Sequence, residues 1–498
     1  MDCRLNMNVL LIYPENPPTF FSFKYALKFI SKKAVEPPLG LLTVSALLPE
    51  YWRKKLIDLN VTNLDPEDIK WADLVFISAM IIQKDSVKDI LGILKNYDTK
   101  IVAGGPLFTH EVENFPDIDH FVLNEAELTL PGFLEDIEHG RAGRIYETGD
   151  YAEMTATPVP DYHLLDINAY ASMSIQVSRG CPFSCEFCEI PLIHGSRVRV
   201  KSREQVISEL HTIFNTGWRG TVSIVDDNFI GRKEYIKNEL LPSVITWMKQ
   251  NDYPFIFNVQ TSANIADDEE LLSLMTQAGI RSTFIGIETL SEESLCLSKK
   301  YQNRNRDMTA EIRKIQEAGL QVSGGFIVGF DTDTPQVFGQ ITEFINKSGI
   351  LWAMVGILNA PKNTRLYHRL KKEQRLTSEM TGNNTDYSLN FVPRMGLDLL
   401  MDGYNSIIQG IYSVRPYYDR IHRMFQNYRP VDFEQVKTDP CYLRGFLKSI
   451  YFLGIIDKGR KEYWKFLFWA LLRKRYVLLE GMMFAMCGYH FRKVYGIS

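Results

Sequence analysis

The chain has 498 residues, of which 45% are hydrophobic, 23% charged and 12% aromatic. This globular composition excludes a disordered or fibrous protein, and at roughly 100 to 200 residues per domain it predicts about three domains. The 56 basic and 60 acidic residues give a formal net charge of −4 without a basic block, so nothing indicates a nucleic-acid partner. Residues 1–10 lack the basic segment and long apolar run of a secretory signal, which predicts a cytoplasmic protein.

The first predicted domain, residues 1–140, alternates short apolar runs with helix-length segments. The runs at residues 8–13 (NVLLIY), 74–79 (LVFISA) and 100–103 (KIVA) are typical of buried parallel strands. Such strands, alternating with helices, predict a doubly wound, Rossmann-like α/β domain. A sheet of this kind binds its ligand beyond the carboxyl ends of its strands, where Gly104, Gly105 and Pro106 follow the third run.

Residues 141–172 lose this periodicity and collect prolines, which indicates a linker. Residues 173–375 contain six further strand-like runs separated by helix-length segments, and they predict a partial (β/α)6 barrel. These runs lie at residues 174–177, 222–225, 255–259, 283–287, 322–328 and 352–358. Residues 376–498 lose the strand pattern and predict an all-helical module.

Three of the seven cysteines, Cys181, Cys185 and Cys188, form a C-x3-C-x2-C motif after the first barrel strand. A strand-to-helix loop at this end of a barrel is where such folds keep their chemistry. Three thiolates at this spacing bind three irons of a 4Fe-4S cluster and leave one iron open, because no fourth cysteine lies nearby. The alternatives are inert buried thiols or a structural zinc site, for which His194 is the only nearby fourth ligand.

This motif, with the aromatic Phe187 directly before Cys188, resembles the signature of radical S-adenosylmethionine (SAM) enzymes. In that family the open iron binds the methionine part of SAM, and an electron from the cluster splits SAM to give a 5′-deoxyadenosyl radical. The resemblance implies the three cysteines as cluster ligands and Phe187 as a SAM contact. It also implies a reductant partner such as flavodoxin or ferredoxin.

The same resemblance assigns SAM contacts to residues that end the later barrel strands. Asp226 and Asp227 follow the second strand, in place of the Gly-Gly-Glu that many radical SAM enzymes use, and a helix cap or turn is the alternative for the adjacent Asn228. For Glu288, the candidate after the fourth strand, the alternative role is a surface salt bridge. For the candidate glycines of the fifth strand, the alternative role is to form tight turns. The further candidates are Gln260 and Ser262 after the third strand, Glu288 after the fourth, and Gly324 and Gly325 in the fifth.

Three basic residues, Arg197, Arg199 and Lys201, alternate after the cysteine loop. They are placed to meet the carboxylate of SAM or the acidic groups of another cofactor. A solvated strand face explains them at least as well, so we leave them out of the predicted site.

The first domain resembles the cobalamin-binding domain that precedes the radical SAM barrel in one large subgroup. The motifs that carry this resemblance are EPPLGL at residues 36–41, SAM at 78–80, GGP at 104–106 and NEAE at 124–127. The sequence lacks the Asp-x-His-x-x-Gly motif that places a histidine on cobalt in many cobalamin proteins, and a domain that keeps the fold without the cofactor is the alternative. The implied cobalamin contacts are Pro38, Leu39, Gly40, Ser78, Ala79, Gly104, Gly105, Pro106 and Glu125.

Residues 181–367 resemble more narrowly the branch that contains the hopanoid C-2 methylases, which also carries a helical C-terminal extension. The implied activity is methylation of an unactivated carbon of a small-molecule or lipid-like substrate, with a 4Fe-4S cluster, SAM and cobalamin as cofactors. A radical SAM rearrangement or cyclisation is the alternative, and a non-catalytic cofactor-binding regulator is a second one.

Residues 410–498 contain many aromatic side chains at helical spacing. Such stripes are more often core than ligand contacts. The alternative is a lid over the barrel, or a face that rests peripherally on a membrane, because the basic run Arg473-Lys474-Arg475 lies beside Trp464 and Trp469. The aromatic residues are Tyr412, Tyr417, Tyr418, Tyr428, Phe446, Phe452, Trp464, Phe466, Trp469 and Phe484.

Overall fold

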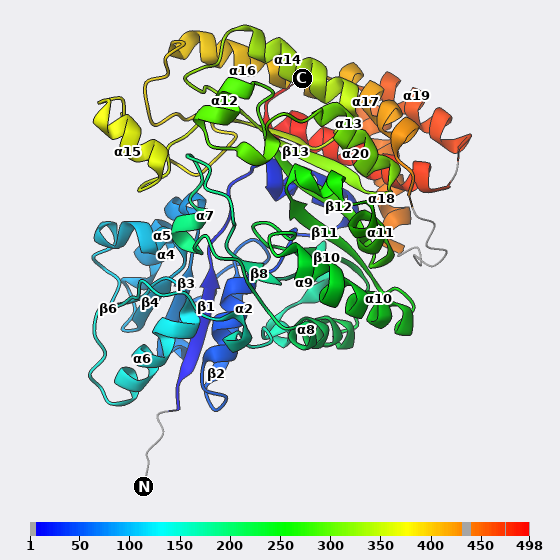
Figure 1. Cartoon of the computed structure of the whole chain (residues 1–498). Coiled ribbons are helices and arrows are strands. Elements are labelled where there is room, and N and C mark those ends of the chain that lie inside the picture. Colours follow the sequence, from blue (N-terminus) through cyan, green and yellow to red (C-terminus); the bar gives the residue numbers. More distant parts are fainter. Residues whose placement is uncertain (1–5, 431–439, 474, 498) are drawn as a thin grey trace.

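The computed structural model describes residues 6–430, 440–473 and 475–497. Two parallel sheets stand side by side, and helices from the C-terminal part of the chain lie across one end of the second sheet (Figure 1). This arrangement confirms the predicted α/β class, with a Rossmann-like first domain, a partial barrel and a helical C-terminal module.

The first sheet has the strand order β2-β1-β3-β4-β5-β6, with all neighbours parallel. Its strands are β1 Asn8–Tyr13, β2 Arg53–Asp58, β3 Leu74–Ser78, β4 Lys100–Gly104, β5 His120–Val122 and β6 Ile145–Tyr146. Its helices are α2 Leu39–Leu47, α3 Pro66–Trp71, α4 Lys84–Leu94, α5 Pro106–Glu111 and α6 Ala126–Glu138. The central strands are apolar on both faces because separate cores cover the sheet from either side.

Sequence reasoning found the three most apolar of these strands and missed the other three. The β2 strand carries Arg53, Lys54 and Lys55, which hide its pattern, while β5 and β6 are only three and two residues long. Because β6 pairs with β5, the N-terminal sheet extends past the predicted domain boundary at residue 140.

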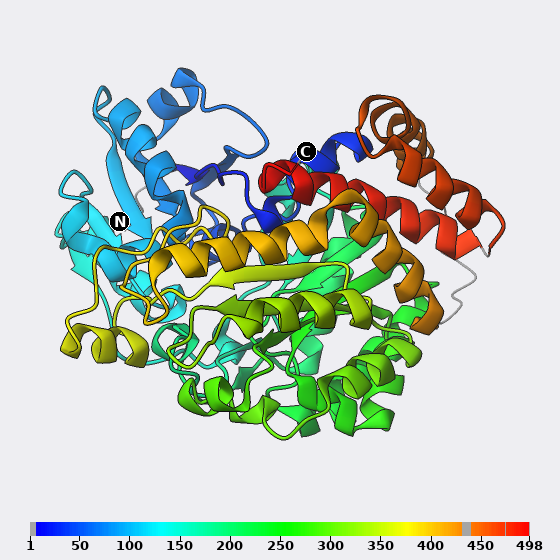
Figure 2. The same cartoon turned by 90° about the horizontal axis from the view of Figure 1, so that it is seen from above.

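Residues 14–38 leave the first domain after β1 and form a strap that sequence reasoning did not assign. The strap contains a short 3-10 helix, η1 (Phe20–Ser22), and α1 (Lys24–Ile30). Its Phe20 ring stacks on Phe491 in the C-terminal module, with 4.4 Å between ring centroids. Figure 2 shows the blue α1 beside the orange and red C-terminal helices. Farther along, Ser172 donates its backbone N–H to Val35 at 2.8 Å, so the strap ends against the barrel edge.

The second sheet has the order β14-β13-β12-β11-β10-β7, again with all neighbours parallel, and confirms the partial (β/α)6 barrel. Its strands are β7 Ser172–Ile175, β10 Gly220–Ile224, β11 Phe255–Thr261, β12 Ile280–Glu288, β13 Gln321–Val328 and β14 Ala353–Ile357. A short antiparallel hairpin, β8 Ser178–Arg179 with β9 Arg199–Val200, flanks the cysteine loop. The helices of this part are α7 Ile190–Ile193, α8 Arg203–Asn215, α9 Lys233–Tyr235, α10 Leu241–Gln250, α11 Glu269–Gln277, α12 Glu292–Leu297, α13 Met308–Glu317, α14 Gln336–Ser348 and α15 Arg365–Lys372.

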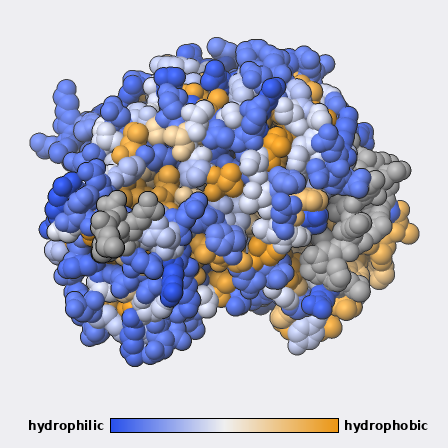
Figure 3. All heavy atoms as spheres, turned by 90° about the horizontal axis from the view of Figure 1, so that it is seen from below, coloured by the Kyte–Doolittle hydropathy of each residue, from blue (hydrophilic) through white to orange (hydrophobic). Residues whose placement is uncertain are grey.

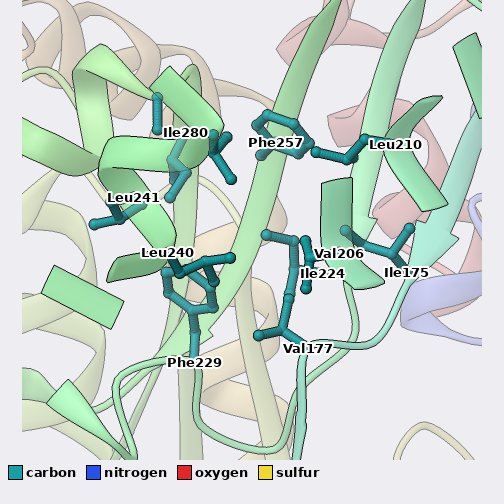
Figure 4. A pocket seen from close by; sticks show the side chains of 12 residues that line it. Ile175, Val177, Val206, Leu210, Ile224, Phe229, Leu240, Leu241, Phe257 and Ile280 are labelled. Atoms are coloured by element: carbon teal, nitrogen blue, oxygen red, sulfur yellow. The ribbon is translucent and has the colours of Figure 1, made fainter. Parts of the chain in front are cut away.

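One small cavity lies between this sheet and its covering helices (Figure 4). Side chains such as Ile224 and Phe257 from the strands and Leu210 and Leu241 from the helices line it, and all of its lining is apolar. Its volume of about 10 Å³ is at the lower limit for one water molecule. The cavity is therefore a gap in core packing and not a substrate site.

The C-terminal module consists of α16 Leu397–Tyr412, α17 Val414–Asn427, α18 Pro440–Tyr451, α19 Arg460–Leu471 and α20 Arg475–Val494, with a π-helix, η10 (Phe452–Ile456), after α18. The core interpretation of its aromatic stripes is confirmed for Tyr412, Tyr417, Tyr418, Tyr428, Phe466 and Phe484, which are all buried. Phe446, Trp464 and Trp469 are half-buried, and Phe452 is exposed. Among the described helices none is both long enough and apolar enough to cross a bilayer.

Candidate cluster and cofactor site

The three cysteines of the motif lie on one irregular loop between β8 and α7, and each is half-buried. The loop is closed by hydrogen bonds from the Cys188 N–H to the Cys185 carbonyl (3.2 Å) and from the Cys181 N–H to the Gly195 carbonyl (3.4 Å). Burial raises the pKa of Cys181, and it raises the pKa of Cys188 to about 12, with the neighbouring cysteines adding to both. The three thiols are half-buried on one short loop and no disulfide joins them, so the residues present fit a 4Fe-4S group.

The zinc alternative does not fit this arrangement. The Nδ1 of His194, the only nearby fourth ligand, lies 3.6 Å from Glu125 Oε1 in the first domain. Within residues 6–430, 440–473 and 475–497, no three His, Cys, Asp or Glu side chains converge closely enough to share a single ion. Cysteines that each bind a different iron of a cluster are not expected to converge in that way.

Asp226 and Asp227 anchor the backbone that leads into the cysteine loop. Asp226 is fully buried and accepts hydrogen bonds from the Val177 N–H (2.7 Å) and the Ser178 hydroxyl (2.6 Å). Burial raises its pKa to about 6. Asp227 accepts from the Gly180 N–H at 3.1 Å. Both carboxylates thus hold the loop in place, and their contact with SAM stays a prediction.

The loop is held from its other side by α15. Arg369 donates to both carboxylate oxygens of Glu186, at 2.7 and 3.2 Å, and to Asp331 at 2.6 Å. Phe187 packs against Phe330, with ring centroids 6.2 Å apart, and remains half-buried beside Cys188. Two independent anchors, at Asp226 and Arg369, therefore fix the geometry of the cysteine loop.

Of the other predicted SAM contacts, Gln260 and Ser262 lie at the carboxyl end of β11, whereas Gly324 and Gly325 lie in the middle of β13. Gln260 is exposed on the inner face of β11, and Ser262 follows that strand and donates its hydroxyl hydrogen to Asn264 at 2.6 Å. Gly325 faces the Phe284 ring on the inner face, where an added Cβ would lie 3.1 Å from it. Gly324 packs instead against Phe326, on the face covered by helices. Their contacts with SAM stay predictions.

Glu288 is paired with Lys300, a residue that sequence reasoning missed. The Lys300 ammonium lies 2.8 Å from Glu288 Oε1, and the two side chains are only 12% and 10% exposed. Glu288 has a left-handed backbone (φ 64°) that follows a register shift in β12, and Gly286 leaves space for both charged groups. Burial opposes the charge of Lys300, yet Glu288 and the nearby Cys185 thiol raise its pKa. A buried cation therefore stands beside the cysteine loop.

The predicted cobalamin contacts of the first domain gather at the carboxyl ends of its strands. Ser78 ends β3 and Ala79 follows it, while Gly104 ends β4 and is followed by Gly105 and by Pro106, the first residue of α5. Gly105 has φ 94°, and an added Cβ would lie 2.8 Å from the Ser78 hydroxyl and 3.1 Å from the Ala79 carbonyl. Pro38 and Leu39 start α2, where a Cβ on Gly40 would meet open space. Gly105 thus lets β3 and β4 end close together, and Gly40 leaves the start of α2 without a side chain, so the residues at this edge fit a cofactor such as cobalamin.

Glu125 and Glu127 connect this edge to the cysteine loop. Glu125 forms a buried ion pair with Arg199 (2.6 Å), and Glu127 pairs with Arg179 (2.8 Å) of the hairpin that flanks the cysteines. Arg199 was not in the predicted site. Lys201 is also buried, in an ion pair with Glu209. The interpretation as a solvated strand face therefore holds only for Arg197, which is exposed. We call the four residues Glu125, Glu127, Arg179 and Arg199 the interdomain clamp. A direct contact between Glu125 and cobalamin stays a prediction.

Replacing Glu125 with Gln should lower the thermal unfolding midpoint at neutral pH, because Arg199 would remain buried without its partner, at a cost of about 3 kcal/mol. Burial alone would raise the pKa of Glu125, but His194, Arg199 and Arg179 outweigh it and hold the pKa at about 2. An unfolded glutamate titrates near about 4.3, so the ion pair stabilises the fold fully above that pH and is lost as the pH falls toward about 2.

Thermal midpoints of wild type and Glu125→Gln, measured from neutral pH down to about pH 3, should therefore differ by a constant amount until about pH 4.5 and converge below it. Glu135→Gln is the matched control, since Glu135 pairs with Arg141 at the exposed surface. Equal midpoints for Glu125→Gln and wild type at neutral pH would contradict the clamp.

Three family models match the chain. A radical SAM superfamily model matches residues 175–345, a B12-binding domain model matches residues 29–134, and a domain model of unknown function matches residues 364–497. These matches agree with the barrel, the first sheet and the helical module.

Curated relatives and a solved structure extend these matches. An uncharacterized methyltransferase of Synechocystis sp. is 40% identical over 423 residues, which cover 84% of this chain and 78% of the relative. The hopanoid C-2 methylase of Rhodopseudomonas palustris is 30% identical over 499 residues, covering 98% and 93%. The structure of the cobalamin-dependent SAM radical enzyme OxsB with aqua-cobalamin and SAM has the same fold, with a TM-score of 0.64, 16% identity and coverage of 98% of this chain and 80% of OxsB.

Proposed function

Because the chain belongs to the cobalamin-dependent radical SAM methyltransferases, in the branch that contains the hopanoid C-2 methylases, we propose that it methylates an unactivated carbon of a lipid-like small molecule. The interdomain clamp carries this proposal. Its two ion pairs hold the cysteine loop against the carboxyl edge of the B12-binding domain. Methyl transfer needs both sites close to one substrate, whereas a vestigial first domain would have no need of this bridge.

When bound, the cluster with SAM supplies a radical that removes a hydrogen atom from the substrate, and methylcobalamin supplies the methyl group. The residues of the chain hold these groups in place. Cys181, Cys185 and Cys188 bind the cluster, and the backbone around Gly104 and Gly105 gives cobalamin a flat surface. The anchors at Asp226 and Arg369 and the clamp keep the distances between the sites fixed, which is the main contribution a protein makes to such chemistry.

A polar row on the inner face of the barrel sheet supports a substrate that carries a polar group. Successive side chains of a strand point to opposite faces of the sheet. On the face away from the covering helices, five neighbouring strands each place a polar residue beside the polar residue of the next strand. The Glu36 carboxyl of the strap lies beside two of the hydroxyls, and burial raises its pKa. The row is formed by Ser174, Ser223, Asn258, Ser282 and Gln321.

Two partners belong to this proposal. A small iron–sulfur or flavin protein such as ferredoxin or flavodoxin would deliver the electron to the cluster, because the half-buried cysteine loop has no electron source of its own. Peripheral contact of the C-terminal helices with a membrane would bring the enzyme to a lipid-like substrate, which is sparingly soluble in water.

The test is anaerobic reconstitution with iron, sulfide and hydroxocobalamin, followed by incubation with SAM labelled in its methyl group, a reductant and a hopanoid-like lipid. We expect bound cobalamin in the visible spectrum, 5′-deoxyadenosine, and a lipid product heavier by one labelled CH2. A product of unchanged mass would replace methylation by rearrangement.

Gly105→Ala separates the two half-reactions in the same assay. Its new methyl group would collide with Ser78 and Ala79 in a left-handed backbone position, so we expect loss of cobalamin and of methylation while SAM cleavage continues. Gly140→Ala is the matched control, because Gly140 also has a positive φ (65°) but open space around it. Full methylation by Gly105→Ala would contradict the placement of cobalamin at this edge.

A further inference from the structure

A ridge of exposed apolar side chains runs along α18, η10 and α19. The largest exposed fractions are those of Leu472 (86%) and Phe468 (62%), followed by Leu447 and Ile455 (both 59%). Side chains of this size normally bury most of their surface, and contiguous exposed patches mark interaction sites. The apolar ridge consists of Leu447, Tyr451, Phe452, Ile455, Ile456, Phe468, Leu471 and Leu472.

The ridge is one continuous surface because Trp464 joins its two halves. The Trp464 indole donates to the Gly454 carbonyl in η10 at 2.9 Å, and its ring lies 5.9 Å from the Phe468 ring in α19. In α18 and η10, Leu447, Tyr451 and Ile455 repeat every four residues and so share one helix face. Figure 3 shows apolar atoms gathered at the edge of the molecule that carries the C-terminal helices.

Positive charge surrounds the ridge. Residues 444–473 contain seven lysines and arginines but only two acidic residues. Both acidic side chains are neutralised within the chain, since Glu462 pairs with Lys465 at 2.7 Å and Asp457 pairs with Arg492 at 2.7 Å. Lys458, Arg460 and Lys461 are exposed beside the apolar side chains. Lys474 lies outside the described residues, as does the side chain of Arg475.

We propose that this ridge docks on an anionic lipid bilayer, with its apolar side chains among the acyl chains and its basic rim on the headgroups. This inference rests on the proposed function, because it identifies where a methyltransferase with a lipid-like substrate meets the membrane that holds that substrate. Charge favours a bilayer over a second copy of the chain, since a symmetric contact would bring two positive rims together. Aromatic and aliphatic groups flanked by lysine and arginine are the composition of interfacial helices.

The ridge is fixed to the catalytic part of the molecule through the strap. Lys448 of α18 donates to the Lys28 carbonyl (2.9 Å) and the Ser31 hydroxyl (2.8 Å), and Phe452 packs edge-on against Phe29 of α1 at 5.6 Å. The strap runs from the end of β1 to the barrel edge at β7. Docking would therefore hold the barrel and the B12-binding domain at a set orientation to the bilayer.

The experiment is sedimentation of the full-length, reconstituted protein with vesicles of phosphatidylcholine, with and without phosphatidylglycerol. We expect binding to the anionic vesicles that weakens in high salt, and at least about tenfold weaker binding for Phe468→Asp/Leu472→Asp. The control is Ile93→Asp/Leu397→Asp, which places the same charges at exposed apolar positions (44% and 51%) outside the ridge and should bind like wild type.

Vesicle binding that is unchanged in the ridge variant would overturn the proposal, as would wild-type binding that is equal with and without phosphatidylglycerol. A wild-type dimer that the ridge variant converts to a monomer, without vesicle binding, would assign the ridge to a second copy of the chain and also overturn it. Methylation of detergent-dispersed substrate is measured in parallel. Its absence in wild type would reject the proposed function, whereas its presence alongside failed vesicle binding would reject the ridge alone.

Discussion

Cys185→Ala should reduce SAM cleavage to the level without enzyme and should remove most of the bound iron. Cys185 is the middle ligand of a loop that offers three thiols, and the loop itself contains no fourth cysteine to replace it. A cluster left with two protein ligands has no defined open iron at which SAM could bind. Iron and sulfide analysis, the visible absorbance of the reconstituted protein and 5′-deoxyadenosine formation measure the effect.

The matched control is Cys296→Ala, which removes an exposed thiol on α12 outside the cysteine loop. It should keep iron, cobalamin and SAM cleavage at wild-type levels. Cobalamin binding by Cys185→Ala itself should also persist, because the first domain has its own core and sheet. Wild-type SAM cleavage by Cys185→Ala would contradict the cluster assignment.

The fold was largely predictable because its strands are short, apolar and separated by helices. All six barrel strands were located from these runs, although the structure shifts their ends by up to about three residues. The strap was not predictable, since its Phe20 meets Phe491 more than 400 residues later and no local pattern reports such a partner. The β2 strand was missed for a different reason, because three basic side chains conceal its apolar half.

The site was predictable only where the motif itself carries the chemistry. The cysteines and the strand-end positions follow from spacing and topology, but the partners of charged residues do not. Glu125 was expected at a cobalamin, and the structure pairs it with Arg199, 74 positions away in the chain. Lys300 lies in the loop after α12 and belongs to no motif. The burial of the Glu288 carboxylate beside Gly286, which calls for a nearby cation, is visible only in the structure.

Lys300→Met should impair reduction of the cluster more than its assembly. The Lys300 ammonium is buried near Cys181, Cys185 and Cys188, where it lowers the pKa of the first and third thiols against the larger effect of burial. At a separation on the order of 6 Å and an effective dielectric constant of about 20, one charge contributes about 3 kcal/mol to the balance between oxidised and reduced states. We therefore expect a reduction potential on the order of 100 mV more negative, measured by spectroscopic redox titration.

SAM cleavage by Lys300→Met should accordingly be lost with flavodoxin as reductant and return in part with titanium(III) citrate. The double variant Lys300→Met/Glu288→Gln separates this effect from simple destabilisation, because the single variant also leaves the Glu288 carboxylate buried without its partner. If the orphaned carboxylate were the cause, the double variant would recover both the thermal stability and the reduction potential of the wild type. If the cation tunes the cluster, the double variant recovers thermal stability but keeps a potential more negative than that of the wild type, because the Lys300 charge that acts on the thiols is still missing.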